Sequence, residues 1–487
     1  MPKKTNCNNL SFDECELEIL KNSIMLAETK IGENIVNSPE IKDIIKTVED
    51  FIMKEDLICY GGISINAVLP EKDKIYNPNY DLSDYDFYSP NAMQDAKNLS
   101  NILYKKGYEQ VEAKNSVHLG TYKVYCQFQG VADITQLPSD LFKTLKKQAV
   151  RVNGILHCPP NFLRMGMYLE LSRPYGEIDR WTKVFHRLSL INKYYPLTSH
   201  QIAKKCNAVP FQREMEEKNQ EKSKQIFEIV RDAFISRGDV FFGGYAINNY
   251  SQYMGFKEKQ QVKMIADFDI LCNDPDVSSQ LVKTNLLEQG IKPVHIKKRP
   301  AIGEIIPEQL EISVGKDIVA VLYKPSACHS FNTIYIQGKQ VKIATIDTML
   351  AFYLAFLYAN KPYYDTERIL CMASFLFQVQ QKNRLQQKGL LKRFTVTCYG
   401  HQTTLEEMKE LKAEKYLELK DKKRGKEYEE WFFNYKPSHI NENENITNIS
   451  KTETIKNSDK KGKGKTKKTK TKTKKTKKTI KNRIFPF

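Results

Sequence analysis

The chain has 487 residues, of which 41% are hydrophobic. It is therefore too long for one ordinary domain and apolar enough to fill at least two cores. The formal net charge of +18 is typical of a nucleic-acid binder, but residues 451–487 hold 16 Lys and Arg against 2 Asp and Glu, which leaves the rest at only +4. The ten cysteines form no Cys-x-x-Cys pair and no Cys/His cluster. This pattern excludes a zinc module of ordinary spacing and predicts a reducing, intracellular setting.

No part of the chain is predicted to cross a membrane. The most apolar segment, residues 343–359, is short for a spanning helix and contains Asp347. An aspartate at the centre of a spanning helix is costly. The N-terminal residues also lack the apolar core of a signal peptide. We expect residues 343–359 to form a buried helix.

An internal repeat organises the chain. Residues 57–66 (Leu-Ile-Cys-Tyr-Gly-Gly-Ile-Ser-Ile-Asn) precede Asp84-Tyr-Asp86 and an apolar-periodic helix that ends at Gly107, and residues 240–248 (Val-Phe-Phe-Gly-Gly-Tyr-Ala-Ile-Asn) precede Asp267-Phe-Asp269 and a similar helix that ends at Gly290. The second glycine and the first aspartate are 22 residues apart in one copy and 23 in the other. We infer two α/β modules, each with a strand, a glycine turn, a helix and a strand that carries Asp-x-Asp.

The predicted fold class is α/β (α+β), with two tandem modules built on mixed sheets, helical additions and a disordered basic tail. The tail begins where the composition turns polar and becomes a Lys/Thr/Gly run with almost nothing to bury. It could bind RNA phosphates, serve as a nuclear address or keep the chain soluble. The expected segments are a first module at 1–200, a connecting segment at 201–225, a second module at 226–345, a helical region at 346–440 and the tail at 441–487.

Three aspartates of the first module are candidate metal ligands. Asp84 and Asp86 alternate along a strand, so their side chains project to the same face. Asp133 lies in the apolar, strand-like stretch Val-Ala-Asp-Ile, where a charge needs a partner. Hard carboxylate oxygens suit Mg²⁺ or Mn²⁺, which catalyse nucleotidyl transfer by in-line displacement of pyrophosphate. A purely structural role for Asp133 stays open.

The glycine turn and a basic helix face are candidate phosphate contacts. Gly61 and Gly62 follow a strand and open a helix, so backbone N–H groups can point at phosphate, and Ser64 adds a hydroxyl donor. Taken alone, this motif favours a structural turn, but at this distance from Asp-x-Asp it becomes specific for a phosphate site. Arg180 and Lys183 lie with Arg187 opposite the apolar face of a predicted helix, where they could bind phosphate or be merely solvated.

These motifs resemble the poly(A) polymerase catalytic subunits of large nucleocytoplasmic DNA viruses, which are similar to DNA polymerase β-type nucleotidyltransferases. The resemblance is carried by Tyr-Gly-Gly-Ile-Ser at 60–64, Ser-Asp-Tyr-Asp-Phe-Tyr-Ser-Pro at 83–90, Val-Ala-Asp-Ile at 131–134 and Tyr-Leu-Glu-Leu-Ser-Arg-Pro at 168–174. It implies that Asp84, Asp86 and Asp133 are the catalytic metal ligands, that ATP is the donor and Mg²⁺ or Mn²⁺ the cofactor, and that AMP is added to an RNA 3′ end.

The same resemblance implies partners, a location and a silent second module. A homodimer or a processivity subunit is the expected partner, and the host cytoplasm with its viral factories, or the virion, is the expected location. The second module keeps Asp267 and Asp269 but has Ala246 where the first has Ser64. Asp317 could align with Asp133, yet Gly-Lys-Asp is more typical of a hairpin turn. We predict a structural module.

Two other functions fit the same residues. A terminal uridylyltransferase, or another nucleotidyltransferase, would use the same metal ligands, because these set the reaction and not the base. A non-catalytic RNA-binding scaffold would instead depend on the basic tail. The complete set of Ser64, Asp84, Asp86 and Asp133 argues against the scaffold.

Overall fold

The computed structural model describes residues 7–77, 79–81, 84–198, 202, 204, 206, 209–212, 219–255, 267–383 and 386–438. The predicted basic tail and much of the predicted connecting segment lie outside these residues. Among the described residues, two mixed sheets of eight strands each are flanked by helices. The α/β fold class with two tandem modules is therefore confirmed, whereas the exact segment boundaries stay a prediction.

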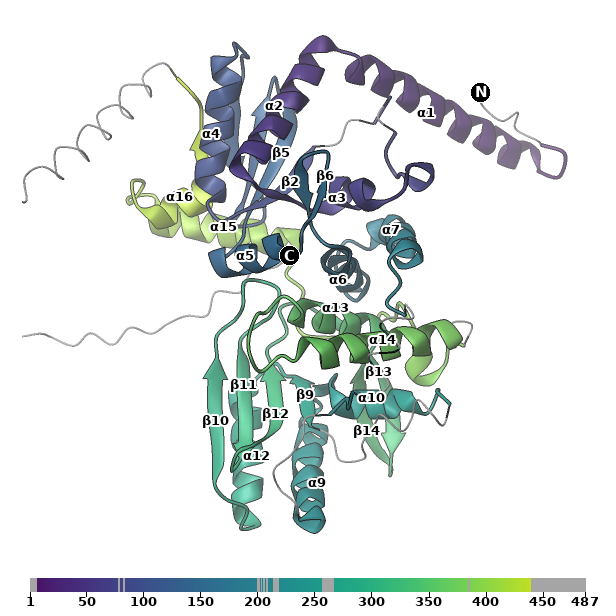
Figure 1. Cartoon of the computed structure of the whole chain (residues 1–487), viewed down its shortest axis with the longest axis vertical. Helices are drawn as coiled ribbons and strands as arrows, with labels where there is room; N and C mark the ends of the chain where they lie inside the picture. Colours follow the sequence, from purple (N-terminus) through teal and green to yellow (C-terminus); the bar gives the residue numbers. More distant parts are fainter. Residues whose placement is uncertain are drawn as a thin grey trace, which may run out of the picture.

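The first module fills the upper half of Figure 1. Its apolar, period-2 strands pack under helices whose apolar faces recur every three to four residues. The elements are α1 (Phe12–Val36), α2 (Pro39–Glu55), β1 (Ile58–Cys59), α3 (Gly61–Val68), η1 (Glu71–Asp73), β2 (Tyr85–Ser89), α4 (Ala92–Lys105), β3 (Glu112–Asn115), β4 (Thr121–Cys126), β5 (Gln129–Gln136), α5 (Ser139–Gln148), β6 (Val150–Val152), β7 (Ile155–His157), α6 (Pro160–Leu171), η2 (Ile178–Arg180) and α7 (Trp181–Tyr194).

The second module and the C-terminal region fill the lower half and part of the left side of the same view. Their elements are α9 (Gln220–Arg237), β8 (Val240–Phe241), α10 (Gly244–Ser251), β9 (Phe268–Leu271), α12 (Pro275–Glu288), β10 (Val294–Arg299), β11 (Gln309–Val314), β12 (Asp317–Tyr323), β13 (His329–Ile336), β14 (Lys339–Ala344), α13 (Ile346–Phe356), α14 (Thr366–Lys382), η3 (Gly389–Leu391), β15 (Cys398–Tyr399), α15 (Leu405–Leu419), α16 (Lys426–Phe432) and β16 (Asn434–Tyr435).

The two sheets share one topology over seven strands each, and the eighth strand lies at opposite edges of the two sheets. The first has the order β16-β3-β4-β5-β2-β1-β7-β6 and the second the order β10-β11-β12-β9-β8-β14-β13-β15. The central pairs correspond in direction as well: β2 runs parallel to β5 as β9 does to β12, and β1 runs antiparallel to β2 as β8 does to β9. The repeat inferred from glycine and aspartate spacing is thus a duplicated fold.

The C-terminal region does not form a layer of its own. Its strand β15 pairs with β13 at the edge of the second sheet, and β16 pairs with β3 at the edge of the first. Between these strands, α15 and α16 cross from one module to the other (Figure 1). Residues that follow the second module in sequence therefore return to the first, which is the arrangement on which the site below depends.

The modules meet through α6 and α13, as Figure 1 shows. The backbone N–H of Ser330 donates a 2.8 Å hydrogen bond to the carbonyl of Ser172, and the rings of Phe162 and Tyr358 pack edge to face. Every residue of α13 is buried. Among the described residues, no helix is long and apolar enough to cross a membrane. The expected buried helix is therefore confirmed, but it spans Ile346–Phe356, because residues 343 and 344 end β14.

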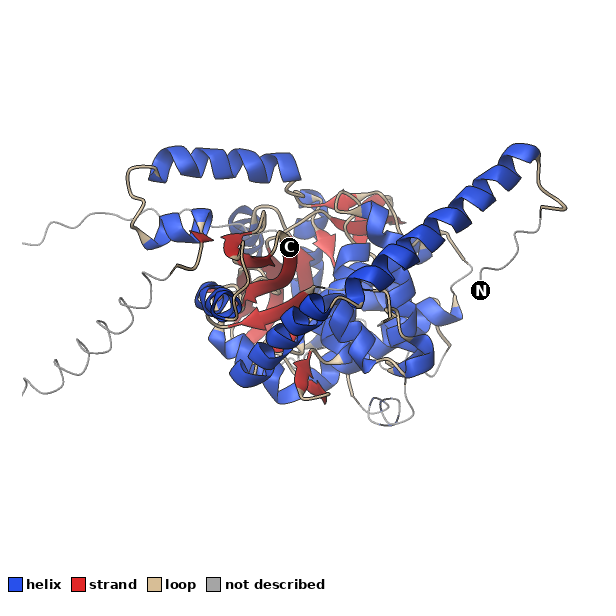
Figure 2. Ribbon diagram, turned by 90° about the horizontal axis from the view of Figure 1, so that it is seen from above, coloured by secondary structure: helices blue, strands red, loops and turns tan. Residues whose placement is uncertain are grey.

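Two features of the fold were not expected. The structure joins three cysteine pairs as disulfides: Cys7–Cys15, Cys206–Cys371 and Cys328–Cys398. Disulfides differ from the expectation of a reducing setting, in which cysteines stay as free thiols. The latter two pairs are distant in sequence and meet only in the fold. The helix α1 extends away from the first module (Figures 1 and 2) and contains no buried residue.

The ion pair of Asp347 with Arg393 yields a prediction on stability. Asp347, 1% exposed, accepts from Arg393 at 2.6 and 3.2 Å. The Asp347→Ala change leaves a largely buried guanidinium without this partner, so we expect a loss of about 3–5 kcal/mol in the free energy of unfolding. Lys339, whose ion pair with Asp232 is exposed, is the control: Lys339→Ala should cost less than about 1 kcal/mol. Thermal unfolding measures both, and equal shifts would contradict the prediction.

Candidate active site

The predicted carboxylates gather at two central strands of the first sheet. Strands β2 and β5 are parallel neighbours, and their register places Asp86 directly opposite Asp133. Asp84 lies at the residue before β2 and is exposed, whereas Asp86 and Asp133 are half-buried. The fold thus brings together three acidic residues that the sequence spreads over 50 positions.

The negative charges of these three carboxylates repel one another. Burial, followed by the negative charges of Asp84 and Asp133, raises the pKa of Asp86 to about 7. Burial also raises the pKa of Asp133, against the effect of Lys123, whose Nζ lies 2.5 Å from its Oδ2. No group of three or more His, Cys, Asp or Glu side chains in the described part of the chain is already arranged to hold a metal ion. A cation there would replace Lys123 as the partner of Asp133.

Gly61 and Gly62 are required where the chain turns beneath the carboxylates. Gly61 opens α3 with a φ of +67°, and a Cβ at this position would lie 2.6 Å from Oδ2 of Asp86. A Cβ at Gly62 would overlap the hydroxyl of Tyr76. The turn is therefore both left-handed and tightly packed, which only glycine allows. It holds the start of α3 against the Asp86 side chain.

Ser64 does not face the cavity. It is completely buried, and its hydroxyl donates to the carbonyl of Cys59 at 2.9 Å and accepts from the N–H of Cys158 at 3.1 Å. These bonds tie the start of α3 to β1 and to the residue after β7. The structure therefore assigns the hydroxyl to the fold, and its predicted contact with phosphate gains no support.

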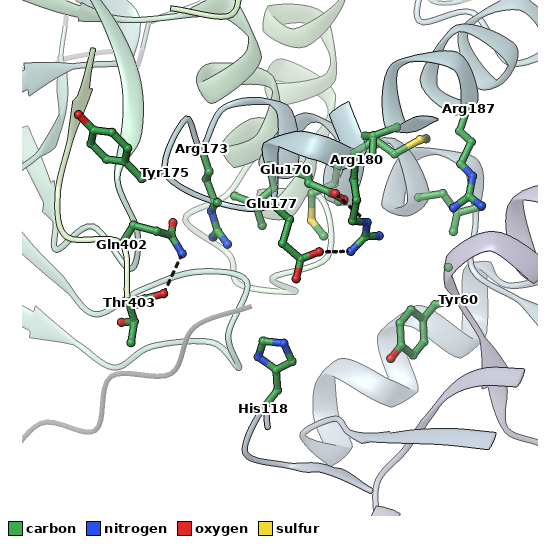
Figure 3. A pocket seen from close by; sticks show the side chains of 18 of the residues that line it. Tyr60, His118, Glu170, Arg173, Tyr175, Glu177, Arg180, Arg187, Gln402 and Thr403 are labelled. Carbon is green, nitrogen blue, oxygen red and sulfur yellow. Dashed lines mark hydrogen bonds and ion pairs between the residues drawn. The ribbon is translucent and has the colours of Figure 1, made fainter. Parts of the chain in front are cut away.

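A cavity of about 620 Å³ opens beside the glycine turn (Figure 3). This volume lies within the range of roughly 300–1,000 Å³ that is usual for small-molecule sites. Tyr60 and Gly61 contribute from the first sheet and its turn, Arg180 and Arg187 from η2 and α7, and residues 402–406 from the segment that enters α15. The cavity is thus built from segments that lie far apart in the sequence.

The three residues of the predicted basic face lie in different environments. Arg180 lines the cavity, where it pairs with Glu177 at 2.5 Å and Glu170 at 3.4 Å. Arg187 was expected on the outer face, but it is buried and donates to the hydroxyl of Tyr76 at 2.7 Å. Lys183 is exposed and outside the cavity lining. The positive charge of Arg187 is the main cause that lowers the pKa of Lys183.

Several lining residues were missed by the sequence analysis. Arg173 belongs to the Ser-Arg-Pro motif, so its position in a matching motif was the available signal. Tyr60 is the first residue of the Tyr-Gly-Gly motif, and its ring stacks on that of Tyr88 with 4.1 Å between the ring centroids. Nothing in the sequence pointed to His118 or Gln402, because neither has a motif or a periodic neighbour that links it to the glycine turn.

The second module has lost the third carboxylate. Asp269 on β9 takes the place of Asp86, but the residue opposite it on β12 is Val321, which is buried. The neighbour of Val321 on β11 is Glu311, an ion-pair partner of Arg299. Asp317 instead starts β12 directly after the two-residue turn Gly315-Lys316, so the hairpin assignment is confirmed.

Comparisons with known proteins agree with this geometry. Residues 46–177 match the family model of the poly(A) polymerase catalytic subunit. The matched region contains all three clustered carboxylates and the glycine turn. This match confirms the resemblance inferred from the motifs.

Individual relatives are similar over the same part of the chain. A protein of African swine fever virus, provisionally assigned as the poly(A) polymerase catalytic subunit, is 33% identical over 187 residues, which are 36% of this chain and 39% of that protein. A protein of Acanthamoeba polyphaga mimivirus with the same assignment is 34% identical over 191 residues, or 37% of this chain and 32% of that protein. The alignments thus span about a third to two fifths of these relatives.

The fold is similar over almost the whole chain. The crystal structure of the Megavirus polyadenylate synthase superposes with a TM-score of 0.72 at 19% sequence identity and covers 93% of this chain and 92% of that one. At this identity the similarity establishes the fold. It extends the resemblance beyond residues 46–177 to the second module and the C-terminal region.

A substitution of Ser64 can distinguish a structural role of its hydroxyl from a contact with phosphate. The Ser64→Ala change leaves the carbonyl of Cys59 and the N–H of Cys158 without this partner, so we expect a loss of about 1–3 kcal/mol in stability. The apparent KM for a nucleoside triphosphate should stay within about twofold, because the hydroxyl does not bind phosphate. Ser189→Ala, at an exposed helix position, should change stability by less than about 0.5 kcal/mol. A large rise in KM without a loss of stability would instead make Ser64 a phosphate ligand.

Proposed function

We propose that this protein is a template-independent poly(A) polymerase, which adds AMP from ATP to RNA 3′ ends and releases pyrophosphate. The observation that carries the proposal is the pairing of Asp86 with Asp133 on parallel strands beside the Gly61 turn. This geometry is present in the first module and interrupted by Val321 in the second. The region matched by the family model supports the same activity.

Asp84, Asp86 and Asp133 are the residues that would hold Mg²⁺ or Mn²⁺. Their hard oxygen donors suit these ions, and their mutual repulsion would be relieved by a cation. When bound, such ions activate the RNA 3′-hydroxyl and neutralise charge on the triphosphate. The protein supplies position: β2 and β5 fix two of the ligands, and Gly61 lets the start of α3 approach them closely.

Basic residues that line the cavity beside the glycine turn supply charge for the anionic substrates. Arg180 reaches the cavity, and its positive charge offsets a small part of the rise in the pKa of Asp86. The guanidinium of Arg187, held by Tyr76, adds a second fixed positive charge. We assign the triphosphate to these two arginines. Lys183, exposed on the helix that carries Arg187, is proposed to contact phosphate of the nucleotide or of the RNA backbone.

The remaining expectations belong to the same proposal. RNA is the acceptor, and either a second copy or a processivity subunit is the partner. The host cytoplasm or the virion stays the predicted location. A terminal uridylyltransferase would keep the same carboxylates, so the nucleotide used by the purified protein separates the two activities.

The duplicated modules offer a matched test of the site. We expect the Asp84→Asn/Asp86→Asn protein to lose extension of a labelled RNA primer by at least about 1,000-fold, because each metal ligand stabilises charge that develops in the transition state. The Asp267→Asn/Asp269→Asn protein removes the corresponding pair from the second module and should retain extension within a few-fold.

The assay supplies each NTP singly with Mg²⁺ or Mn²⁺, and thermal unfolding confirms that both variants are folded. Long products with ATP are the expected result. Products with UTP alone would make the protein a terminal uridylyltransferase that uses the same mechanism. Loss of activity in the folded second-module variant would contradict the silent assignment, and absence of extension by the wild type would contradict the proposed function.

The basic tail gives a separate prediction on RNA binding. Removal of residues 451–487 takes away a net charge of +14. If these lysines bind phosphates, RNA affinity should fall, and the slope of log K against log salt should become shallower by about 0.7 for each phosphate that the shortened chain no longer neutralises. Filter binding over a salt series measures both. Unchanged affinity and slope would leave the tail as a solubility or targeting element.

A further inference from the structure

The segment that enters α15 forms one wall of the cavity although it follows the second module in sequence. It runs from β15, at the edge of the second sheet, to Thr404, which caps α15. Figure 3 shows Gln402 and Thr403 on one side of the cavity and Tyr60 on the other. A ligand that touches the glycine turn at one end can therefore reach this segment at the other.

Both ends of the segment are anchored. The disulfide between Cys328 and Cys398 joins β13 to β15, and the hydroxyl of Tyr399 donates to Asp239 at 2.9 Å. At the other end, Thr404 and Glu407 form a reciprocal capping box with bonds of 2.8 and 3.2 Å. The backbone that presents Gln402 is thus held in place before any ligand arrives, which favours selective contacts over adaptable ones.

The side chain of Gln402 has an unused hydrogen-bonding group. Its Oε1 is shielded from solvent and has no hydrogen-bond partner among the residues that the structure describes. Its Nε2 makes a long, 3.5 Å contact with the carbonyl of Thr403. Buried amide oxygens are normally paired, and an unpaired one is costly. A donor group on a bound ligand would satisfy it once the amide turns toward the cavity that Gln402 lines.

The charge along the cavity orients a nucleotide. Arg180 and Arg187 line the wall nearer the glycine turn, where an anionic triphosphate is favoured. At the other end the first turn of α15 carries Glu406 and Glu407, and this helix terminus is already capped. Arg173 also lines the cavity on the Gln402 side (Figure 3), so its guanidinium and the Glu406 carboxylate leave that end without an excess of positive charge, which favours a neutral group that donates hydrogen bonds over phosphate. A nucleobase meets that requirement.

Tyr175 adds an aromatic surface on the same side. It lines the cavity, is 67% exposed, and lies on the Gln402 side in Figure 3. Stacking of a base on an aromatic ring contributes about 1–3 kcal/mol and is tolerant of base identity. Tyr175 can therefore hold a base without choosing it, which leaves the choice to hydrogen bonds.

We infer that Gln402 recognises the adenine base of the nucleotide held in this cavity, with its Oε1 accepting from the 6-amino group and its Nε2 donating to a neighbouring ring nitrogen. The inference rests on the proposed function. A glutamine amide has the complementary donor and acceptor for this edge of adenine. The base can belong to the incoming ATP or to the 3′-terminal adenosine of the growing RNA, and both sources present the same chemistry.

The test removes the 6-amino group and the amide separately. In one arm, ATP is compared with purine riboside triphosphate on a common primer. In the other, ATP extends primers that end in adenosine or in purine riboside. We expect the wild type to prefer adenine by about 10- to 100-fold in kcat/KM in one of the arms, and the Gln402→Ala protein to lose most of that preference. The arm that responds identifies the source of the base.

Controls separate a specific effect from damage to the fold. The Gln402→Asn change keeps an amide and should restore part of the preference. Gln386→Ala, at an exposed position outside the cavity lining, should leave both kinetics and preference unchanged. Thermal unfolding of each variant reports folding independently of activity.

The outcomes distinguish failure of this inference from failure of the proposed function. A wild type that extends RNA with ATP while Gln402→Ala keeps the full adenine preference in both arms overturns the role of Gln402 and leaves the proposed function intact. A wild type that uses adenine and purine equally well in both arms also overturns the role of Gln402 and leaves the proposed function intact. A wild type that incorporates no nucleotide overturns the proposed function together with this inference.

Discussion

The parallel pairing of β2 with β5 is the constraint on which the site depends. It places Asp86 opposite Asp133, two carboxylates that would repel each other in water and that burial makes more costly still. Such an arrangement is maintained only if something compensates for it, and Lys123 does so for Asp133. The glycine turn then lies so close to Asp86 that no side chain fits at Gly61. The sheet register, the charge cluster and the turn form a single structural unit.

The second module shows what happens when that constraint is relaxed. Its sheet has the same order and directions, yet Val321 occupies the position opposite Asp269. A buried valine costs no desolvation and contributes apolar packing, so the duplicated strand pair is retained without the full carboxylate set. The module instead provides α13, which packs on α6, and β13, which holds β15. These contacts fit the structural role predicted for the second module, which the Asp267→Asn/Asp269→Asn variant tests.

The cavity follows from the way the chain closes on itself. After the second module, the chain pairs β15 with one sheet and β16 with the other, so the segment at 402–406 is stretched across the opening beside the glycine turn. One wall carries Arg180 and Arg187, and the wall across from it carries the amide of Gln402 and the carboxylate of Glu406. The proposed orientation of a nucleotide rests on this difference and not on the fold class.

The sequence by itself determined the repeat, the carboxylates and the fold class, because these depend on short-range spacing that is the same in any conformation: alternate residues share a strand face, and a glycine pair opens a helix. It could not decide which polar side chains are buried. Ser64 was expected to contact phosphate, and Arg187 was expected on an outer helix face, but hydrogen bonds to partners far along the chain bury both, with Arg187 still lining the cavity. It also could not place Gln402 beside Gly61, since their proximity depends on the crossing of the C-terminal segment between two sheets. Only the tertiary structure decides such contacts, because they are made by residues that no local pattern connects.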